Sequence, residues 1–279
     1  DVIRMALAAA GSLQPSILRL QSELSESLCA ERNAEETPLT EELRLAARIQ
    51  RDFLPRKMPE VGPFRFAAVF RPAEWVSGDI YDVARLDETH IGLYVADAVG
   101  HGMPAALLTM FIKKALQTKR IAGHAYEIVS PGDALAALNG DICDQQLSSC
   151  EFCTAVYGVV DVERRTLTFA RAGHPEPLRV RGDRPVEGLG GSGSLLGIFP
   201  EETFEPVETA LAPGDRIVIY SDGAERAFEA FGGFPALLEH LAGAELSVLL
   251  NELTGRLNAL RGSPMLDDDV TVVMMEVGE

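Results

Sequence analysis

The sequence contains few of the residues that mark several common protein classes. Its 279 residues include one Trp, four Cys and only 25 Lys and Arg. Four cysteines are too few for a disulfide framework in a chain of this length, and no apolar run approaches the roughly 18 residues that a membrane span requires. We therefore expect a protein of a reducing compartment, the cytoplasm, with no membrane span in this part of the chain.

The chain has few basic side chains relative to acidic ones. The 42 Asp and Glu residues outnumber the 25 Lys and Arg residues, which gives a formal net charge of −17. Residues 1–56 carry seven basic and nine acidic side chains, a net charge of −2, so −15 of the −17 belongs to residues 57–279. A surface of this charge repels a phosphate backbone, which argues against nucleic acid as a partner. With 47% apolar residues, the chain can nevertheless bury a full core.

Apolar side chains recur at alternating spacings of three and four near the N-terminus. This pattern indicates a helix with a narrow apolar stripe, as in paired helices. Pro15 interrupts it, and two heptads are fewer than a sustained coiled coil usually has. Two interpretations stay open: a short, kinked coiled coil that joins two copies of the chain, and an amphipathic helix packed on its own domain. The positions of the stripe are Ala10, Leu13, Ile17, Leu20 and Leu24.

A second helix begins near residue 38. Thr37 can cap it, Pro38 suits the first helical position, and Glu41 and Glu42 favour the positive end of the helix dipole. The helical pattern stops at Leu54, before a proline. We therefore assign residues 1–56 to a helical linker and dimerisation segment.

From residue 57 onward the pattern changes to short β-like runs separated by helical stretches. The order of elements favours antiparallel sheets with segregated helices over a doubly wound parallel sheet. Residues 57–279 are therefore expected to form one domain, with Gly190–Ser194 as a loop. The expected strands are 64–70, 80–86, 91–96, 152–160, 166–171, 177–180, 216–220 and 270–277, and the expected helices are 104 to about 119, 131 to about 147, 235–241 and 247–260.

Aspartates gather at the ends of these expected strands, next to glycines or turns. Carboxylates that project together from strand ends repel one another unless cations hold them. Oxygen donors without a Cys/His set favour Mg²⁺ or Mn²⁺ over zinc, and two such ions about 3.5–4 Å apart suit hydrolysis at phosphorus. Individually, each aspartate is also compatible with an ordinary turn or cap role. The residues are Asp79, Asp82, Asp97, Asp222, Asp267, Asp268 and Asp269.

Seven motifs in order give these aspartates a family context. The chain resembles the bacterial PPM/PP2C-type serine/threonine phosphatases of the SpoIIE/RsbU branch, which reverse phosphorylation of anti-sigma-factor antagonists. The matching motifs are Ala-Arg-Ile-Gln-Arg-Asp-Phe-Leu-Pro at 47–55, Ser-Gly-Asp-Ile-Tyr-Asp at 77–82, Asp-Ala-Val-Gly-His-Gly-Met-Pro-Ala-Ala at 97–106, Ala-Gly-His-Pro-Glu-Pro-Leu at 172–178, Leu-Leu-Gly-Ile-Phe at 195–199, Tyr-Ser-Asp-Gly at 220–223 and Asp-Asp-Asp-Val-Thr at 267–271.

The resemblance implies an α+β fold, the αββα four-layer sandwich, with a site for two Mn²⁺ or Mg²⁺ ions at one end. Carried over to this chain, it makes Asp97 the carboxylate that bridges both ions, with the backbone carbonyl of Ala98 as a further ligand. Asp222 and Asp268 would complete the coordination of one ion, and Asp79 that of the other. The same four aspartates are the expected catalytic residues.

Two further aspartates are secondary candidates in this scheme. The family pattern places its last ligand three residues before a Thr or Ser, here Thr271, which selects Asp268 over Asp269. Asp269 and Asp82 are left as supporting candidates around the ions.

The resemblance also implies partners. The expected substrate is a phosphorylated STAS-domain protein, and helices 1–30 and 38–54 resemble linkers that couple an upstream sensor to the phosphatase through a homodimer. Because the chain starts at Asp1 and not at Met, we expect it to be a piece of a longer protein or a processed chain.

Departures from the family pattern define an alternative. Ser77 and Ile80 stand where the family usually has Gly and Phe, so a pseudophosphatase that acts as a binding module is the second hypothesis. Animal-type relatives have a phosphate-binding arginine shortly before the first acidic motif. Here Glu74 and Trp75 occupy that place and Arg71 lies further away, which leaves phosphate affinity to the metals alone.

Two histidines and a cysteine pair are candidates for other chemistry. His101 and His174 could protonate a leaving serine oxygen, but their glycine-flanked positions favour structural hydrogen bonding. Cys150 and Cys153 form a Cys-x-x-Cys pair without a partner pair, and strand alternation places them on opposite faces. We therefore expect neither zinc nor redox chemistry there.

Overall fold

A computed structural model describes residues 39–123, 125–146, 152–182, 184–260 and 268–279. The chain divides into two compact units, Asp1–Ala46 and Ala47–Glu279. In the first unit, residues 39–46 are helical; the apolar stripe at 10–24 lies outside the described residues. The larger unit begins with helical residues 47–53.

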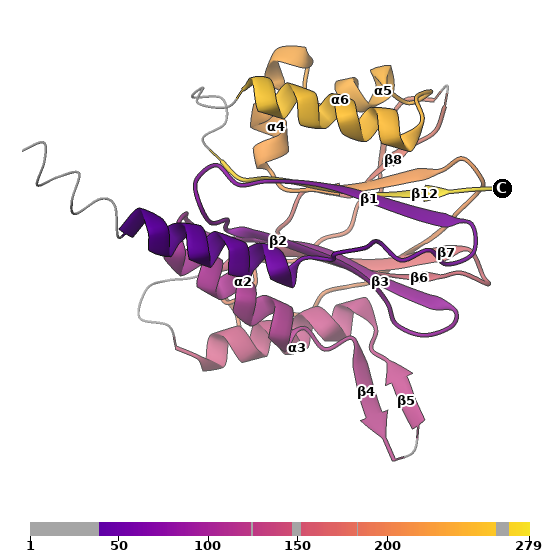
Figure 1. Cartoon of the computed structure of the whole chain (residues 1–279). Helices are drawn as coiled ribbons and strands as arrows, with labels where there is room; N and C mark the ends of the chain where they lie inside the picture. The colour runs from indigo at the N-terminus through magenta and orange to yellow at the C-terminus, as the bar shows by residue number, and fades with distance from the viewer. Residues whose placement is uncertain (1–38, 124, 147–151, 183, 261–267) are drawn as a thin grey trace, which may run out of the picture. The chain divides into compact units, whose positions relative to one another are not determined.

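Two five-stranded antiparallel sheets form the centre of this unit (Figure 1). Each strand is hydrogen-bonded to neighbours of opposite direction, as the sequence predicted. The first sheet consists of β1 (Phe64–Arg71), β12 (Val270–Val277), β11 (Arg216–Tyr220), β8 (Leu178–Val180) and β9 (Glu187–Gly188). The second consists of β10 (Val207–Ala210), β7 (Thr166–Ala172), β6 (Cys153–Asp161), β3 (His90–Ala98) and β2 (Asp79–Arg85).

Helices cover the outer face of each sheet, which makes four layers (Figure 1). Helices α2 (Met103–Ala115) and α3 (Pro131–Asp144) lie on the second sheet. Helices α4 (Gly223–Ala227), α5 (Phe234–His240) and α6 (Leu246–Ala259) lie on the first, together with a short 3-10 turn at Glu229–Phe231.

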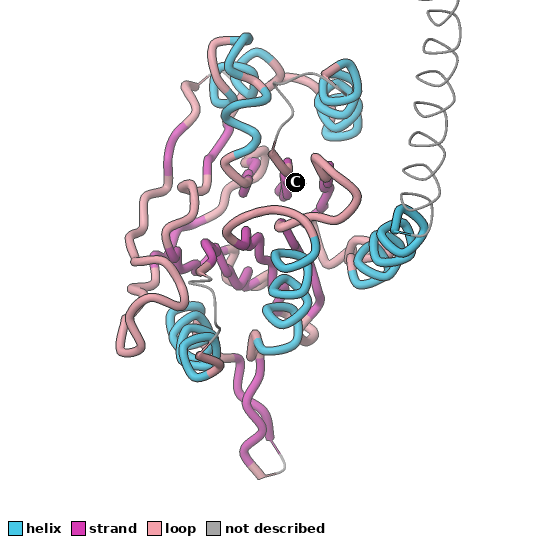
Figure 2. Tube along the Cα trace, turned by 90° about the vertical axis from the view of Figure 1, so that its left-hand side faces the viewer, coloured by secondary structure: helices cyan, strands magenta, loops and turns pink. Residues whose placement is uncertain are grey.

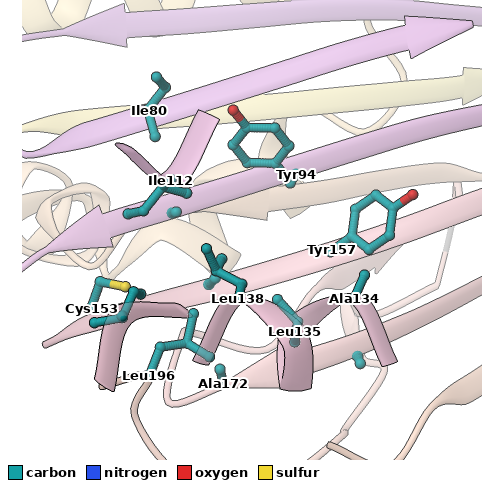
Figure 3. Close-up of a cluster of buried hydrophobic side chains, with 14 of the residues drawn as sticks. Ile80, Tyr94, Ile112, Ala134, Leu135, Leu138, Cys153, Tyr157, Ala172 and Leu196 are labelled. Atoms are coloured by element: carbon teal, nitrogen blue, oxygen red, sulfur yellow. The ribbon is translucent and has the colours of Figure 1, made fainter. Parts of the chain in front are cut away.

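Strand alternation distributes the apolar residues between these layers. In β3, Leu93 and Val95 point into the core between the two sheets, whereas Tyr94 and Ala96 point toward α2 and α3. The strand is buried on both faces, and its sequence is accordingly an almost unbroken apolar run. Figure 3 shows the outer cluster, in which Tyr94 and its neighbours meet side chains of both helices.

The region between α2 and α3 differs from the prediction. The predicted helix from Pro104 to about 119 ends at Ala115, and a separate hairpin of β4 (Lys119–Ala122) and β5 (Ala125–Ile128) follows. The hairpin projects from the body (Figure 2). Its large side chains are exposed, Ile121 to 82%, so the segment has no buried face and produces no strand periodicity in the sequence.

The other long elements were predicted correctly within a few residues at their ends. The exceptions are short pieces: β9, β10 and α4 have two to five residues each, too few for a periodic signal. Within the described part of the chain, no helix is long and apolar enough to cross a membrane.

Candidate metal centre

Four strand ends bring the predicted aspartates to one end of the sandwich. In the second sheet, Asp79 starts β2 and lies opposite Asp97, near the end of β3. In the first sheet, β11 ends just before Asp222, next to the start of β12, which Asp268 precedes. A hydrogen bond from Ser221 Oγ to Asp79 Oδ2, 2.7 Å long, joins the two sheets at this end.

The aspartates differ in depth. Asp79 is 1% exposed and Asp269 8%, so these two form the floor of the site. Asp97 and Asp268 are half-buried and Asp222 is exposed. The site therefore extends from a buried carboxylate, Asp79, to an exposed one, Asp222.

Asp79 has one carboxylate oxygen without a partner. Its Oδ2 accepts from Ser221, whereas its Oδ1 is buried and is left without a well-formed hydrogen bond among the described residues, although the nearby Thr271 hydroxyl lowers the pKa of this carboxyl. Burial, followed by the charges of Asp97 and Asp269, raises the pKa of Asp79 well above its usual value. A buried polar atom of this kind is normally satisfied, so an orphaned carboxylate oxygen fits a cation.

Asp97, on the second sheet, experiences the charges at the end of the first sheet. Burial, together with the charges of Asp222, Asp268 and Asp269, raises its pKa from 3.8 to about 8. Arg226 acts in the opposite direction. A carboxylate surrounded by carboxylates loses its proton at neutral pH only if positive charge is added, which divalent cations would supply.

The backbone at Ala98 explains why position 78, in the Ser-Gly-Asp motif, is a glycine. Ala98 N–H donates to the Gly78 carbonyl oxygen at 2.9 Å. A Cβ at Gly78 would lie 2.9 Å from the Ala98 carbonyl oxygen, which leaves no room for a side chain. The carbonyl predicted as a ligand is thus held against the turn that carries Asp79.

Ser77, which departs from the family pattern, has a structural partner here. It is fully buried, and its Oγ accepts from the Asp79 backbone N–H at 3.1 Å. A hydrogen bond from Ser77 also lowers the pKa of Asp269, against the stronger effect of burial. The replacement therefore supports the turn that precedes Asp79.

Asp268 and Asp269 have different partners. Asp269 accepts from the backbone N–H groups of Ala73 (2.8 Å) and Gly78 (2.6 Å), so both of its oxygens are engaged. Asp268 Oδ1 accepts from the Asp269 backbone N–H at 2.9 Å, and its Oδ2 lies 3.3 Å from Arg226 Nη1. Asp269 fastens β12 to the turn before β2, whereas Asp268 faces the other carboxylates.

The donor set fits Mn²⁺ or Mg²⁺ better than zinc, because it consists of carboxylate and carbonyl oxygens. As the side chains stand, no three His, Cys, Asp or Glu residues within the described ranges form a group that could hold a metal ion. Like charges repel at this range, and a divalent cation is what would draw the carboxylates together.

The remaining candidates lie outside this cluster. Asp82, three residues after Asp79, accepts from Lys113 Nζ at 2.6 Å and fastens α2 to β2. His101 is exposed and its Nδ1 is 3.4 Å from a Glu74 carboxylate oxygen. Asp267 lies outside the described residues.

His174 and the cysteine pair have buried or undescribed positions. His174 is 1% exposed, its Nδ1 lies 2.6 Å from Thr154 Oγ1, and burial lowers its pKa to about 3, so the ring is neutral. Cys153 is buried on β6, and burial raises the pKa of its thiol. Cys150 lies outside the described residues.

Sequence reasoning assigned no site role to Gln50, which contacts the turn of the Ser-Gly-Asp motif. Its Nε2 donates to the Ser77 carbonyl oxygen at 2.6 Å and to Thr109 Oγ1 at 3.2 Å, and its Oε1 accepts from Ser77 N–H at 2.9 Å. Gln50 is 4% exposed. The sequence feature that could have identified Gln50 is its position as a polar residue on the apolar face of the 38–54 helix.

Comparison with known proteins identifies the family to which the chain belongs. The family described as Stage II sporulation protein E (SpoIIE) matches residues 87–278. The chain belongs to the SpoIIE family. It is 31% identical over 183 residues to the phosphoserine phosphatase RsbU of Bacillus subtilis, an alignment that covers 65% of this chain and 52% of RsbU. It is also 28% identical to protein IcfG of Synechocystis, over 81% of this chain and 40% of that protein. The chain thus spans about half, or less, of the length of these relatives.

Solved structures of the family share the fold. The SiaA-PP2C domain of Pseudomonas aeruginosa superposes with a TM-score of 0.73 at 24% identity, over 87% of this chain and 98% of that domain. The RsbU and RsbW domains of Rv1364c from Mycobacterium tuberculosis give a TM-score of 0.63 at 27% identity, over 79% of this chain and 62% of that one. The expected αββα sandwich of PP2C type is therefore confirmed.

Proposed function

We propose that this SpoIIE-family chain is a metal-dependent protein serine/threonine phosphatase. The observation that carries the proposal is the orphaned, buried Oδ1 of Asp79, which lies among carboxylates from two sheets. The identity to RsbU, a protein named phosphoserine phosphatase, supports the reaction class.

The residues proposed to hold the ions are Asp79, Asp97, the Ala98 carbonyl, Asp222 and Asp268. Asp97 is proposed as the shared ligand, because it lies opposite Asp79 of its own sheet and its pKa responds to Asp222 and Asp268 at the end of the other sheet. When bound, two Mn²⁺ or Mg²⁺ ions activate water and stabilise the charge that develops on the phosphoryl group.

Neighbouring side chains keep these donors in place. The Ser221 hydroxyl donates to Asp79, on the second sheet, and accepts from the Thr271 backbone N–H at 2.9 Å, on the first sheet. This one hydroxyl therefore fixes the Asp79 carboxylate relative to strand β12. Asp269 holds the turn at Gly78. This rigid floor costs little reorganisation when ions and substrate bind.

The proposed substrate is a phosphorylated STAS-domain protein, as the SpoIIE/RsbU resemblance implies. We also propose a cytoplasmic location, residues 57–279 as the phosphatase domain, and residues 1–56 as a linker that dimerises and connects an upstream sensor. The contacts of Gln50 support a coupling role for the 38–54 helix, because a movement of this helix would act directly on the Ser77 backbone.

The test is phosphate release from a phosphoserine peptide with and without Mn²⁺, in the wild type and in Asp222→Asn. Asp222 is exposed, so its substitution leaves the fold intact. We expect Mn²⁺-dependent release that the substitution abolishes. The matched control is Glu163→Gln, an exposed carboxylate in the turn after β6, at the opposite end of the sheet. Equal rates in wild type and Asp222→Asn would contradict the mechanism.

The pseudophosphatase hypothesis has a separate test. It predicts no calorimetric binding of Mn²⁺ at sub-millimolar concentration, whereas the phosphatase requires it. The hydrogen bond from the Asp79 backbone to Ser77 argues against this alternative, because the departure from the family pattern is accommodated.

A further inference from the structure

Arg226 lies at the rim of the carboxylate cluster. It belongs to α4, the short helix that starts directly after Asp222. Ala224 and Ala227 of the same helix are fully buried in the core beneath, so they fix its orientation. The Arg226 side chain is 59% exposed and points away from this core.

The guanidinium acts on carboxylates of both sheets. Arg226 Nη1 is 3.3 Å from Asp268 Oδ2, and its charge lowers the pKa of Asp268 and of Asp97, against the larger effect of burial on each. An ion pair with a side chain this exposed contributes little stability. Arg226 can therefore exchange Asp268 for another anion at low cost.

Bound divalent cations would change the partner of Arg226. If Asp268 is a metal ligand, its Oδ2 becomes committed to the ion, since Oδ1 already accepts from the Asp269 backbone. The ion also repels the guanidinium. The anion that then arrives at this rim is the phosphoryl group of the substrate, and a planar guanidinium can donate to two of its oxygens at once.

We propose that Arg226 binds the substrate phosphate, after releasing the Asp268 carboxylate that it contacts when no ion is bound. The inference rests on the proposed phosphatase function. It replaces the expectation, drawn from the displaced position of Arg71, that phosphate affinity rests on the metals alone.

The proposal predicts effects of opposite sign on two ligands. Removing the charge of Arg226 takes away a competitor of the cations, so Mn²⁺ binds more tightly. The same change takes away a phosphate donor, so phosphate binds more weakly. A residue that only supports the fold would weaken both.

The test compares Arg226→Gln and Arg226→Lys with the wild type. Mn²⁺ affinity is measured by calorimetry, without turnover, and phosphate affinity as competitive inhibition by inorganic phosphate of Mn²⁺-dependent phosphoester hydrolysis. For Arg226→Gln we expect Mn²⁺ affinity to rise about two- to fivefold, the range for one exposed charge pair, and the inhibition constant to rise about tenfold. Arg226→Lys keeps the charge but not the planar fork, so its Mn²⁺ affinity stays at the wild-type value while phosphate still binds more weakly.

Two further variants complete the test. Arg164→Gln removes an exposed arginine at the opposite end of the second sheet and is expected to change neither constant. Arg71→Gln tests the other arginine at this end, since Arg71 lies opposite Val270 in the register of β1 and β12.

The outcomes separate the inference from the function on which it rests. Unchanged phosphate inhibition in Arg226→Gln, with or without an effect of Arg71→Gln, would overturn the inference while the phosphatase assignment stands. Weaker binding of both ligands in Arg226→Gln would overturn it as well. A wild type that neither binds Mn²⁺ nor hydrolyses the phosphoester would instead overturn the proposed function.

Discussion

Buried carboxylates near the two ends of strand β11 lie in opposite electrostatic settings. Asp215 precedes the strand and is 2% exposed, and its carboxylate accepts from Arg181 Nε at 2.6 Å and from the Ala212 backbone N–H at 3.0 Å. Burial alone would raise the pKa of Asp215, but these hydrogen bonds and the nearby Arg179 lower it below its usual value. At the other end, Asp79 and Asp97 have raised pKa values.

The difference separates a carboxylate that is neutralised within the fold from the carboxylates that we propose as metal ligands. Asp215 receives its positive charge from arginines of the same chain, so the cluster is complete when the protein folds. Around Asp79, the Ser221 and Thr271 hydroxyls lower the pKa of the carboxyl, yet Oδ1 is left without a well-formed hydrogen bond among the described residues. This imbalance of charge supports the proposal that this end of the sandwich binds cations.

The largest expected effect comes from a substitution at the proposed metal site. Asp97→Asn keeps the size of the side chain and removes its charge, so Mn²⁺-dependent phosphate release should fall about a hundredfold or more, the several kcal/mol that metal catalysis supplies. The metal-free variant should unfold at the same denaturant concentration as the wild type or a higher one, since a mutual repulsion is lost. A folded Asp97→Asn protein with wild-type turnover would remove Asp97 from the mechanism.

The opposite end should respond in stability and not in metal binding. Asp215→Asn leaves Arg181 and Arg179 without their shared carboxylate, and we expect a loss of about 3 kcal/mol in the free energy of unfolding. Denaturant titration measures this loss, and calorimetry should give unchanged Mn²⁺ affinity for the folded protein. If fully folded Asp215→Asn bound Mn²⁺ more weakly than the wild type, the two ends of the sandwich would not be independent, which would contradict the proposed division of roles.

The comparison predicts a pH dependence of opposite sign at the two ends. The pKa of Asp97 rises from 3.8 to about 8 on folding, so its contribution to stability is present below pH 3.8 and is lost as the pH rises toward 8. Metal-free protein should therefore melt at a higher temperature at pH 5.5 than at pH 8. Asp215, with a lowered pKa, contributes stability that is lost only as the pH falls below its ordinary value of 3.8.

Two controls sharpen this pH experiment. Saturating Mn²⁺ should raise the melting temperature most at pH 8, where the carboxylates are ionised, and Asp97→Asn should flatten the metal-free profile. A metal-free wild type that is more stable at pH 8 than at pH 5.5 would contradict the raised pKa values.

A smaller effect is expected from the contact between the helix and the turn. Gln50→Ala removes hydrogen bonds to both backbone groups of Ser77, which should cost about 1–2 kcal/mol of stability. If Gln50 positions the turn, Mn²⁺ affinity should also fall several-fold. Gln145→Ala, at an exposed glutamine after α3, is the matched control. A loss of stability with unchanged Mn²⁺ affinity would limit Gln50 to a packing role.

The sequence predicted the long strands and the location of the site, because both have local signals. Strand β3 is a continuous apolar run that ends in an aspartate, and Gly78 and Gly223 mark close backbone approaches beside aspartates. A Cβ at Gly223 would lie 2.1 Å from the Asp269 carbonyl oxygen. The αββα arrangement itself came from the family resemblance, since periodicity alone cannot order the strands.

Other features depend on contacts between distant residues. The family spacing selected Asp268 over Asp269, but the role of Asp269 rests on hydrogen bonds to residues 196 and 191 positions away, which no local pattern encodes. The β4–β5 hairpin lacks a buried face and therefore lacks a signal. Asp82 is a case that alternation could have resolved, because a residue three positions from Asp79 points to the opposite face of the strand.

The central claim, that one end of the sandwich is built to receive cations, is tested most directly by calorimetric titration of the wild type with Mn²⁺. The account predicts two ions per chain at sub-millimolar concentration, with binding lost in Asp97→Asn and retained in Asp215→Asn. No Mn²⁺ binding by the folded wild type, or equal binding by Asp97→Asn, would contradict it.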